Sequence, residues 1–410
     1  MLKLHRPLIG VASCYNAAAP RNIALMREAR SVKMGVAPGH ATPREFRAIA
    51  ATGGTAMGGL CSSLRLRQSM ADSLGLTIRG HAYDVGPAGC DESMMLALAL
   101  LRLSVSPIFI YGGSIVSGTG GKVMELIAAI IRPRDIVTRR LLKNAAAVFA
   151  ACGDNAAALH LRGIAHELGL FNMAEIFKKT PYVADLKPAG RYVAKDMFEA
   201  RGVPLLMKTL LDHSHLHGDC LTVTGRTIAD NLKSVKFNPH QDMVRSTDKP
   251  ITATGGVVAL KGNLAPKGAI VTVAGMSNLR FISPARCLEA GEDEAVPTAP
   301  PTGQGAGGKI APITNGRFSG ATRPFCVGPE AAGPIGLLRD GDVMGIDAVA
   351  GTLNVKLNDS ELARSRSRWL PGATNHTSEG LSKYAQKVGQ AGGAVTHPEG
   401  AYEKQCHANI

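Results

Sequence analysis

Short apolar runs that alternate with helical patterns are the feature that most constrains the fold of the first 240 residues. Leu8–Ala12 predicts a buried strand, and Asn22–Val36 carries apolar side chains at helical spacing. Pro107–Tyr111 predicts another strand, ended by Gly112-Gly113, and Ala145–Leu170 is rich in Ala and Leu at helical spacing. Strands that alternate with helices predict a three-layer α/β domain with a mostly parallel sheet.

The pattern changes near residue 250, where strand signals replace helical ones. Val257–Leu260 and Ala269–Val273 predict two strands, joined by a turn at Lys261–Gly268. Thr352–Leu357 alternates apolar and polar residues with a period of two. Short strands with closely spaced turns are typical of a barrel or a sandwich, so we expect a β-barrel-like C-terminal domain.

Length and this change of pattern together predict two domains, since a domain usually takes roughly 100–200 residues. We expect an α/β N-terminal domain over residues 1–240, a β-rich domain over residues 250–395 and a tail over residues 396–410. The Pro- and Gly-rich stretch 289–308 predicts a flexible loop. Near the end, Asp359-Ser360 is expected to cap a short helix that continues to Trp369.

Composition excludes several classes of protein. With 45% apolar residues the chain is not disordered, and no apolar run approaches the roughly 20 residues that span a membrane. The 8 cysteines are spaced singly, and no secretory signal is visible, so we expect a reducing compartment, the cytoplasm or an organelle matrix. The net charge of +14 suits an anionic partner such as nucleic acid, but the basic residues are spread out, which favours a solvated surface.

Cys90, Asp91 and Glu92 immediately precede an apolar run, Met94–Leu103, that predicts a helix. Asp91 suits the N-cap position, and Glu92 suits the first turn, where the helix dipole favours an anion. The same dipole lowers the pKa of a thiol, so Cys90 is a candidate metal ligand. The alternative is a capped helix with an inert cysteine, and the spacing alone favours it.

A second candidate site is the turn Gly316–Arg323, which follows a short predicted strand at Ile310–Ile313. Ser319 could act there as a nucleophile, a base or an anion donor. Arg317 and Arg323 could hold a carboxylate. A tight turn with exposed arginines is the alternative.

Two other motifs carry less information. Thr52–Gly59 is rich in glycine like a phosphate cradle, but it lacks the lysine of a P-loop, so a loop is the simpler interpretation. His213, His215 and His217 alternate, as the metal ligands of a strand do, but they more readily mark the polar end of a helix.

Long stretches of the chain match one known family, in order and over nearly the whole length. They include Arg6–Val11, Ile49–Gly58, Gly89–Asp91, Ile131–Ile136, Leu186–Tyr192, Leu216–Gly225, Gly262–Pro266 and Gly316–Thr322. These stretches resemble the dihydroxy-acid dehydratases and the related 6-phosphogluconate and sugar-acid dehydratases. The segments Leu186–Tyr192 and Leu216–Cys220 resemble the branched-chain enzyme more closely than the sugar-acid enzymes.

The resemblance implies an α/β N-terminal domain, a β-barrel-like C-terminal domain and a homodimer with its site between the domains. It implies a hydro-lyase that removes water from a small 2,3-dihydroxy acid to give a 2-keto acid in branched-chain amino-acid biosynthesis. Such a reaction needs a Lewis acid at the 3-hydroxyl and a base for the 2-proton. In the family an iron–sulfur cluster on three cysteines, a Mg²⁺ ion on carboxylates and a carbamylated lysine, and a serine base meet these needs.

Carried over position by position, the resemblance makes Cys90 a cluster ligand, Asp91 a magnesium ligand and Ser319 the base. Glu92 stands where the family has the lysine, and a glutamate cannot be carbamylated, which makes it a doubtful metal ligand. The remaining substrate-binding candidates share the turn of the serine and are Arg317, Gly320 and Thr322.

The chain departs from the family at the metal centre. Arg21 stands in the place of the first cluster cysteine, Gly53 replaces a magnesium carboxylate, and no Gly-Ala-Cys-Gly-Gly stretch is found. A family segment is missing near residues 121–130, and the loop 289–308 replaces one that bears a glutamate. Because one cysteine cannot hold an iron–sulfur cluster, we expect neither the cluster nor Mg²⁺ to be bound, and we expect dehydration to be impaired.

Two further interpretations are left open by the sequence. The chain could be a non-catalytic homologue that serves as a basic scaffold or as a structural subunit of a larger, RNA-containing assembly. It could also come from a degraded or misassembled gene that has lost two segments.

Overall fold

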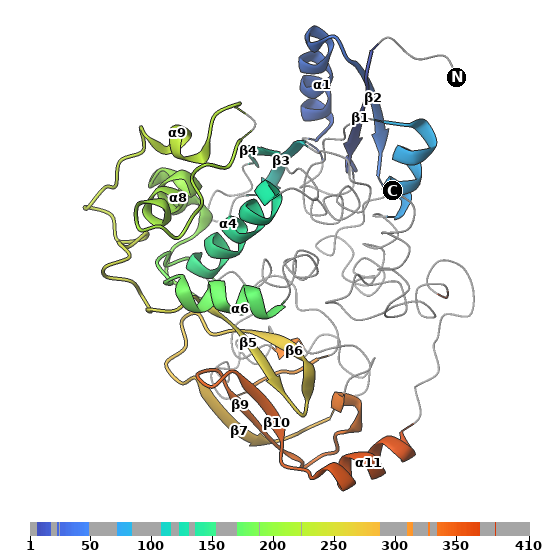
Figure 1. The fold of residues 1–410 in the computed structure, drawn as a ribbon, viewed down its shortest axis with the longest axis vertical. Helices are drawn as coiled ribbons and strands as arrows, with labels where there is room; N and C mark the ends of the chain where they lie inside the picture. Colours follow the sequence, from blue (N-terminus) through green and yellow to red (C-terminus); the bar gives the residue numbers. More distant parts are fainter. Residues whose placement is uncertain are drawn as a thin grey trace.

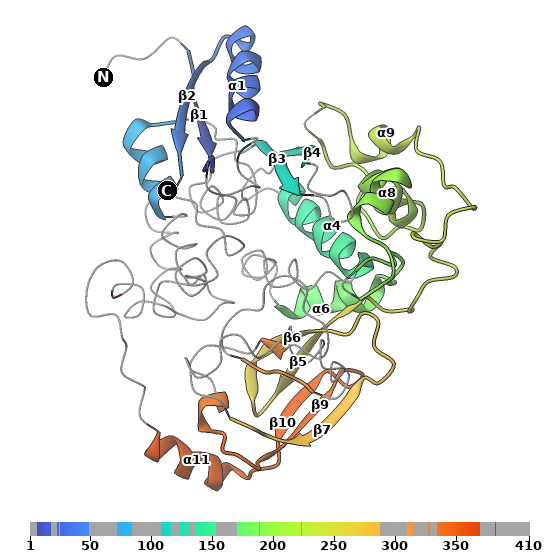
Figure 2. The same ribbon diagram turned by 180° about the vertical axis from the view of Figure 1, so that it is seen from behind.

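The computed structural model is that of a mixed α/β protein, shown in Figures 1 and 2. The structure describes residues 6–17, 23, 25–48, 72–83, 108–115, 123–130, 136–152, 170–187, 189–222, 224–287, 310–314, 327–328, 334–369 and 382. Within these ranges, no helix is both long and apolar enough to cross a membrane.

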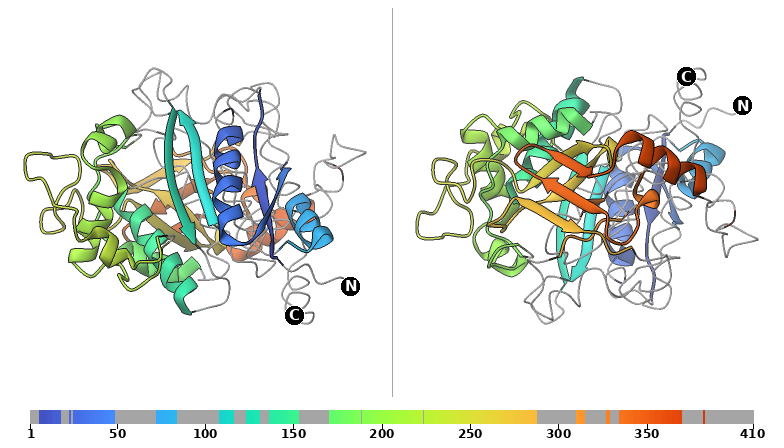
Figure 3. Two further views of the ribbon diagram at one scale, coloured as in Figure 1. Left: turned by 90° about the horizontal axis from the view of Figure 1, so that it is seen from above. Right: turned by 90° about the horizontal axis from the view of Figure 1, so that it is seen from below.

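A β-α-β unit begins the fold. Strands β1 (Leu8–Ser13) and β2 (Thr42–Arg47) pair in parallel, and α1 (Leu25–Val36) connects them through the short 3-10 helix η1 (Ala37–Gly39). The predicted strand Leu8–Ala12 is therefore confirmed, as is the predicted helix from residue 25 to its end. Helix α1 covers one side of the pair, and the helical residues 72–81 lie on the other side (Figure 3).

A two-stranded hairpin lies beside α1, on the side away from β1 and β2 (Figure 3). It pairs β3 (Ile108–Ile115) with β4 (Val123–Ile130) in antiparallel orientation. The prediction that the first of these strands ends at Gly112-Gly113 is wrong, because irregularities in the ladder carry the strand through both glycines. The mostly parallel sheet predicted here is seen only in β1 and β2, since the hairpin is antiparallel.

Helices and connecting segments form the next region. They are α4 (Ile136–Cys152), α6 (Leu170–Lys179), α7 (Ala194–Glu199), α8 (Gly202–Asp212) and α9 (Ile228–Leu232). The buried face of α8 packs with Val183, Ala184 and Val244 into one apolar core. The single helix predicted at Ala145–Leu170 is wrong at its start, because α4 already begins at residue 136; residues 153–169 lie outside the described ranges.

The second half of the chain forms a six-stranded sheet at the opposite end of the molecule from β1 and β2 (Figures 1 and 2). Its strands are β5 (Val257–Gly262), β6 (Ala265–Thr272), β7 (Arg280–Pro284), β8 (Val327–Gly328), β9 (Val343–Asp347) and β10 (Thr352–Val355). They run in the order β7-β9-β10-β5-β6-β8, and only β10 and β5 pair in parallel. Between its end strands β7 and β8 the described sheet does not close, so the predicted barrel is not confirmed.

The prediction of a turn at Lys261–Gly268 is wrong, because most of these residues lie in strands. Strand β5 runs to Gly262 and β6 starts at Ala265. The connection is this tight because the Asn263 side chain pairs with the backbone of Val355: its Nδ2 donates to the carbonyl at 2.9 Å, and its Oδ1 accepts from the N–H at 2.8 Å.

The last helix, α11 (Asp359–Arg368), follows the 3-10 helix η3 (Pro334–Leu337) and strands β9 and β10. Its cap is Asn358, not the predicted Asp359-Ser360. Asn358 Oδ1 accepts a hydrogen bond from the Glu361 backbone N–H, and the Glu361 carboxylate accepts one from the Asn358 N–H, each at 2.9 Å. This reciprocal pair is a capping box one residue before the predicted start.

Candidate active site

In open α/β sheets, ligands bind where parallel strands reach their carboxyl ends. Here that edge lies at Ser13 of β1 and Arg47 of β2, which are directly opposite each other. The segments that leave this edge lead to residues 18–22 and 49–71, which lie outside the described residues. Those two segments carry Arg21 and Gly53, the two positions at which the chain departs from the metal ligands of the family it resembles.

Two hydrogen bonds and one cation–π contact hold the described residues at this edge in place. The Ala48 N–H donates to the Ser13 carbonyl at 3.0 Å, and the Tyr15 N–H donates to Ser13 Oγ at 3.2 Å. The guanidinium of Arg47 lies 4.6 Å from the centroid of the Tyr15 ring. Cys14 is fully buried beside them. The edge therefore presents a cation held on an aromatic ring.

The other face of the same strands is closed by stacked rings. The Tyr83 ring lies 5.7 Å from that of Phe46 and 5.3 Å from that of His81, centroid to centroid. Tyr83 covers β1 at Gly10, where a Cβ would lie 2.7 Å from the tyrosine ring. Tyr83 is the last described residue before the predicted metal ligands in the sequence.

The described residues that flank the predicted serine turn in the sequence lie at the edge of the second sheet. Val327 of β8 pairs with β6 and forms a parallel bridge with Ile313. Its carbonyl accepts from the Thr314 N–H at 3.1 Å, and its N–H donates to the Pro312 carbonyl at 3.0 Å. Of the predicted strand at Ile310–Ile313, only this bridge is found. The residues on either side of the segment 315–326 are thus hydrogen-bonded to each other at the sheet edge.

None of the predicted site residues lies within the described part of the chain, and their roles stay predictions. This holds for both predicted groups: Cys90, Asp91, Glu92, Arg317, Ser319, Gly320 and Thr322. The motif at Thr52–Gly59 and the loop 289–308 also lie outside it.

The described cysteines do not assemble a metal centre. Cys14, Cys152, Cys220 and Cys287 lie on separate segments of the chain and form no disulfide with one another. Among the residues described, no three His, Cys, Asp or Glu side chains come together as a metal site. Burial, and then Asp219, raise the pKa of Cys220, which favours an inert protonated thiol. The donor set in this part of the chain therefore does not fit an iron–sulfur cluster.

The alternating histidines mark a helix end, as predicted. His213 is the residue at which α8 ends, and its Nδ1 lies 3.0 Å from the Thr209 carbonyl. Burial, and then the neighbouring His213, lower the pKa of His215.

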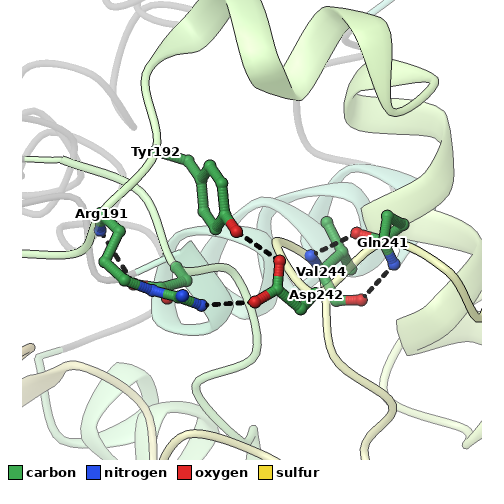
Figure 4. Close-up of polar contacts among 6 residues, drawn as sticks. Arg191, Tyr192, Gln241, Asp242 and Val244 are labelled. Atoms are coloured by element: carbon green, nitrogen blue, oxygen red, sulfur yellow. Dashed lines mark hydrogen bonds and ion pairs between the residues drawn. The ribbon is translucent and has the colours of Figure 1, made fainter.

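The family-like segment Leu186–Tyr192 forms a polar cluster with Asp185 and Asp242 (Figure 4). Buried Asp185 accepts from the Arg191 backbone N–H at 3.0 Å and from Arg191 Nε at 2.6 Å. The other end of the guanidinium donates to Asp242 at 2.8 Å, and the Tyr192 hydroxyl donates to the second oxygen of the same carboxylate. The hydrogen bond from Tyr192, and then Arg191, lower the pKa of Asp242.

The cluster holds two distant segments of the chain together. The Gln241 side chain pairs with the backbone of Val244: its Nε2 donates to the carbonyl at 2.6 Å, and its Oε1 accepts from the N–H at 2.8 Å (Figure 4). Val244 in turn forms an antiparallel β-bridge with Ala184. Gly190 is required in the turn, because a Cβ there would lie 2.3 Å from the Asp185 backbone. The sequence gives no sign of the pairing with Asp242, since the partners are 51 residues apart.

The other family-like segment, around His217 and Cys220, docks onto α4. Asn144 on α4 is buried; its Oδ1 accepts from the His217 N–H at 2.7 Å, and its Nδ2 donates to the His217 carbonyl at 3.0 Å. Asp219 pairs with Arg140 of the same helix. The segment therefore supports the fold. A lone Asn in the Ala-rich part of α4 is the signal that sequence reasoning missed.

The helical region also touches the six-stranded sheet directly. Gly275 has φ +72°, and a Cβ there would lie 2.5 Å from the Ala189 carbonyl. Gly255 is packed in the same way: a Cβ there would lie 2.8 Å from the Ala150 Cβ, and its N–H donates to the Phe177 carbonyl at 2.9 Å. Two glycines thus allow close contact between the helical region and the segments that flank β5 and β6.

Comparison with known proteins identifies the class to which this fold and these segments belong. The profile of the dihydroxy-acid/6-phosphogluconate dehydratase N-terminal domain matches residues 6–121 and 114–231. The corresponding C-terminal profile matches residues 242–299 and 291–394. The chain belongs to this family.

Individual relatives match this chain over nearly their whole length. Dihydroxy-acid dehydratase 2 of Bradyrhizobium diazoefficiens is 54% identical over 537 residues, covering 100% of this chain and 94% of the relative. Dihydroxy-acid dehydratase 2 of Mesorhizobium japonicum is 48% identical over 537 residues, covering 100% and 92%. The dihydroxy-acid dehydratase of Parvibaculum lavamentivorans is 44% identical over 539 residues, covering 100% and 94%.

Proposed function

We propose that this protein is a shortened dihydroxy-acid dehydratase that binds small 2,3-dihydroxy acids but has lost cluster-dependent dehydration. The observation that carries the proposal is a difference in length. The Bradyrhizobium relative aligns over 537 positions, whereas this chain has 410 residues, so well over a hundred positions of the relative face no residue here. Each family profile also matches in two pieces that meet within this chain.

The meeting points support the two gaps that the sequence predicts. The pieces of the N-terminal profile meet at residues 114–121, between β3, which ends at Ile115, and β4, which begins at Val123. Strands on either side of this gap are thus antiparallel neighbours. The pieces of the C-terminal profile meet at residues 291–299, inside the Pro- and Gly-rich loop 289–308.

Loss of the metal ligands is the chemical reason for the proposed loss of turnover. Of the three cluster cysteines that the resemblance implies, only one has a counterpart in this chain, Cys90; Arg21 replaces another, and the third has no matching stretch. The described cysteines supply no substitute group. Ser319 would still be available as a base, but a base alone does not assist departure of the 3-hydroxyl, which needs a Lewis acid.

The family resemblance also leads us to propose a homodimer and a barrel-like second domain. The departures at the metal ligands lead us to propose that Mg²⁺ is not bound, and the singly spaced cysteines favour a reducing compartment, the cytoplasm or an organelle matrix. The profiles stop at residue 231 and resume at 242, which supports the boundary predicted between residues 240 and 250. No described feature favours a nucleic-acid scaffold beyond the net charge of +14, so we do not propose that role.

A paired turnover and binding assay tests this proposal. After anaerobic treatment with iron, sulfide and Mg²⁺, this protein and the Bradyrhizobium relative are each given 2,3-dihydroxy-3-methylbutanoate, and the 2-keto acid is quantified. We expect this chain to be at least about a thousandfold slower than the relative, as expected when a catalytic metal is lost. Calorimetry is expected to show that it still binds the acid. Turnover near that of the relative, or no binding, would contradict the proposal.

A further inference from the structure

One cation at the carboxyl edge of β1 and β2 lacks an acidic partner among the described residues. Arg47 is the last residue of β2, and it is exposed. The acidic residue on the same face of the strand, Glu45, pairs with Lys33 of α1. Several described arginines elsewhere do have acidic partners, in the pairs Arg140–Asp219, Arg191–Asp185 and Arg280–Asp347.

Arg47 is also held in one orientation. Its guanidinium lies over the Tyr15 ring, which belongs to the segment that leaves β1 at the same edge. A cation over an aromatic face is attracted by the ring quadrupole, and stacking reduces the freedom that the side chain would lose on binding a ligand. The N–H edges of a stacked guanidinium stay available to a carboxylate, which they match with two parallel hydrogen bonds.

We propose that Arg47, oriented by Tyr15, binds the carboxylate of the small acid that enters this edge. The inference rests on the proposed function for the choice of acid. It rests on geometry for the residue, because parallel strands commonly bind ligands at this edge and Arg47 lies there with no acidic neighbour among the described residues. The interaction is one of binding and orientation, with no proton transfer.

The same strand offers a matched control. Arg44 is also exposed on β2, but strand alternation places it on the opposite face, with Phe46 and Tyr83. Its guanidinium donates to the Pro43 carbonyl at 3.2 Å. Removing either arginine changes the net charge equally, so the two variants separate a local contact from a general electrostatic effect.

The test is calorimetric titration of 2,3-dihydroxy-3-methylbutanoate into the full-length protein and its variants. We expect Arg47→Gln to weaken binding by about tenfold or more, because it removes a charge-assisted pair of hydrogen bonds. Arg47→Lys should fall in between, and Arg44→Gln should stay within about twofold of the parent. The neutral amide of the acid should bind the parent and Arg47→Gln equally.

Tyr15 supplies a second, independent variant pair. Tyr15→Phe keeps the ring and should bind the acid like the parent, whereas Tyr15→Leu should lose several-fold in affinity. If the parent binds the acid and Arg47→Gln, with an unchanged melting temperature, binds it equally well, the role of Arg47 is wrong while the proposed function stands. If the parent does not bind the acid under conditions in which the Bradyrhizobium relative does, the proposed function itself is wrong.

Discussion

Two regions of this molecule use their arginines in different ways. Around α4 and α8, Arg191 lies between Asp185 and Asp242, and Arg140 pairs with Asp219. At the carboxyl edge of β1 and β2, Arg47 meets an aromatic ring and no described acid. Paired arginines join backbone segments, whereas an arginine with no acidic partner among the described residues can bind an anion, as we propose for Arg47. The contrast separates residues that hold this fold from residues that can serve a ligand.

The largest expected effect comes from breaking the paired region at its turn. Gly190→Ala would place a methyl group 2.3 Å from the Asp185 backbone, which the turn cannot accommodate without moving. We expect the free energy of unfolding to fall by about 3 kcal/mol or more, measured by urea denaturation.

Gly35 provides the control for this change. It lies within α1 with no atom near its added Cβ, so Gly35→Ala should raise stability by about 0.5–1 kcal/mol. Equal effects of the two substitutions would show that the turn at Gly190 is not the constraint.

A smaller loss should follow from breaking the contact between α4 and the segment at His217. Asn144→Ala leaves the His217 N–H and carbonyl without their partner in a buried site. We expect a cost of about 1–3 kcal/mol in the free energy of unfolding. Asn238→Ala, which removes one exposed hydrogen bond to the His240 N–H, should cost less than about 0.5 kcal/mol. A loss at Asn144 no greater than at Asn238 would contradict the docking role.

The smallest expected effect is a pH dependence of stability that tests one further paired charge of the helical region, Asp230 on α9. The Lys233 ammonium, and then the Thr227 hydroxyl, lower the pKa of Asp230 from 3.8 to about 2. A lowered carboxyl pKa in the folded state stabilises the protein above the unfolded value and loses this contribution as the pH falls toward 2. The melting-temperature difference between the parent and Asp230→Asn should therefore shrink from pH 5 to pH 2. A difference that stays constant over this range would argue against the pairing.

The sequence predicts those helices and strands whose residues form a clear apolar pattern within one short segment. The strand at Leu8–Ala12 has an uninterrupted apolar run, and α1 has a regular apolar face; both were predicted from these signals. The turn at Lys261–Gly268 was wrong because Asn263 bonds to Val355, which is 92 residues away, and this contact shortens the connection. No window of sequence contains such a contact.

The residues of the candidate site likewise fall into those that sequence motifs indicate and those that only the structure brings together. Motif reasoning names Cys90, Asp91 and Ser319, whose roles stay predictions. The structure adds Arg47 and Tyr15, which the motifs did not single out, because their meeting depends on the parallel register of β1 with β2. Asp185 and Asp242 escaped prediction for a similar reason, since a bridge between Ala184 and Val244 brings them together.

The central claim is that this chain retains the dehydratase fold without the metal centre of its family. Anaerobic incubation with ferrous iron and sulfide, followed by desalting, metal and sulfide analysis and visible absorbance, tests it most directly, with the Bradyrhizobium enzyme treated in parallel. The account predicts folded protein with far less than stoichiometric iron and sulfide and no charge-transfer absorbance. Stoichiometric iron and sulfide on this chain, with that absorbance, would contradict it.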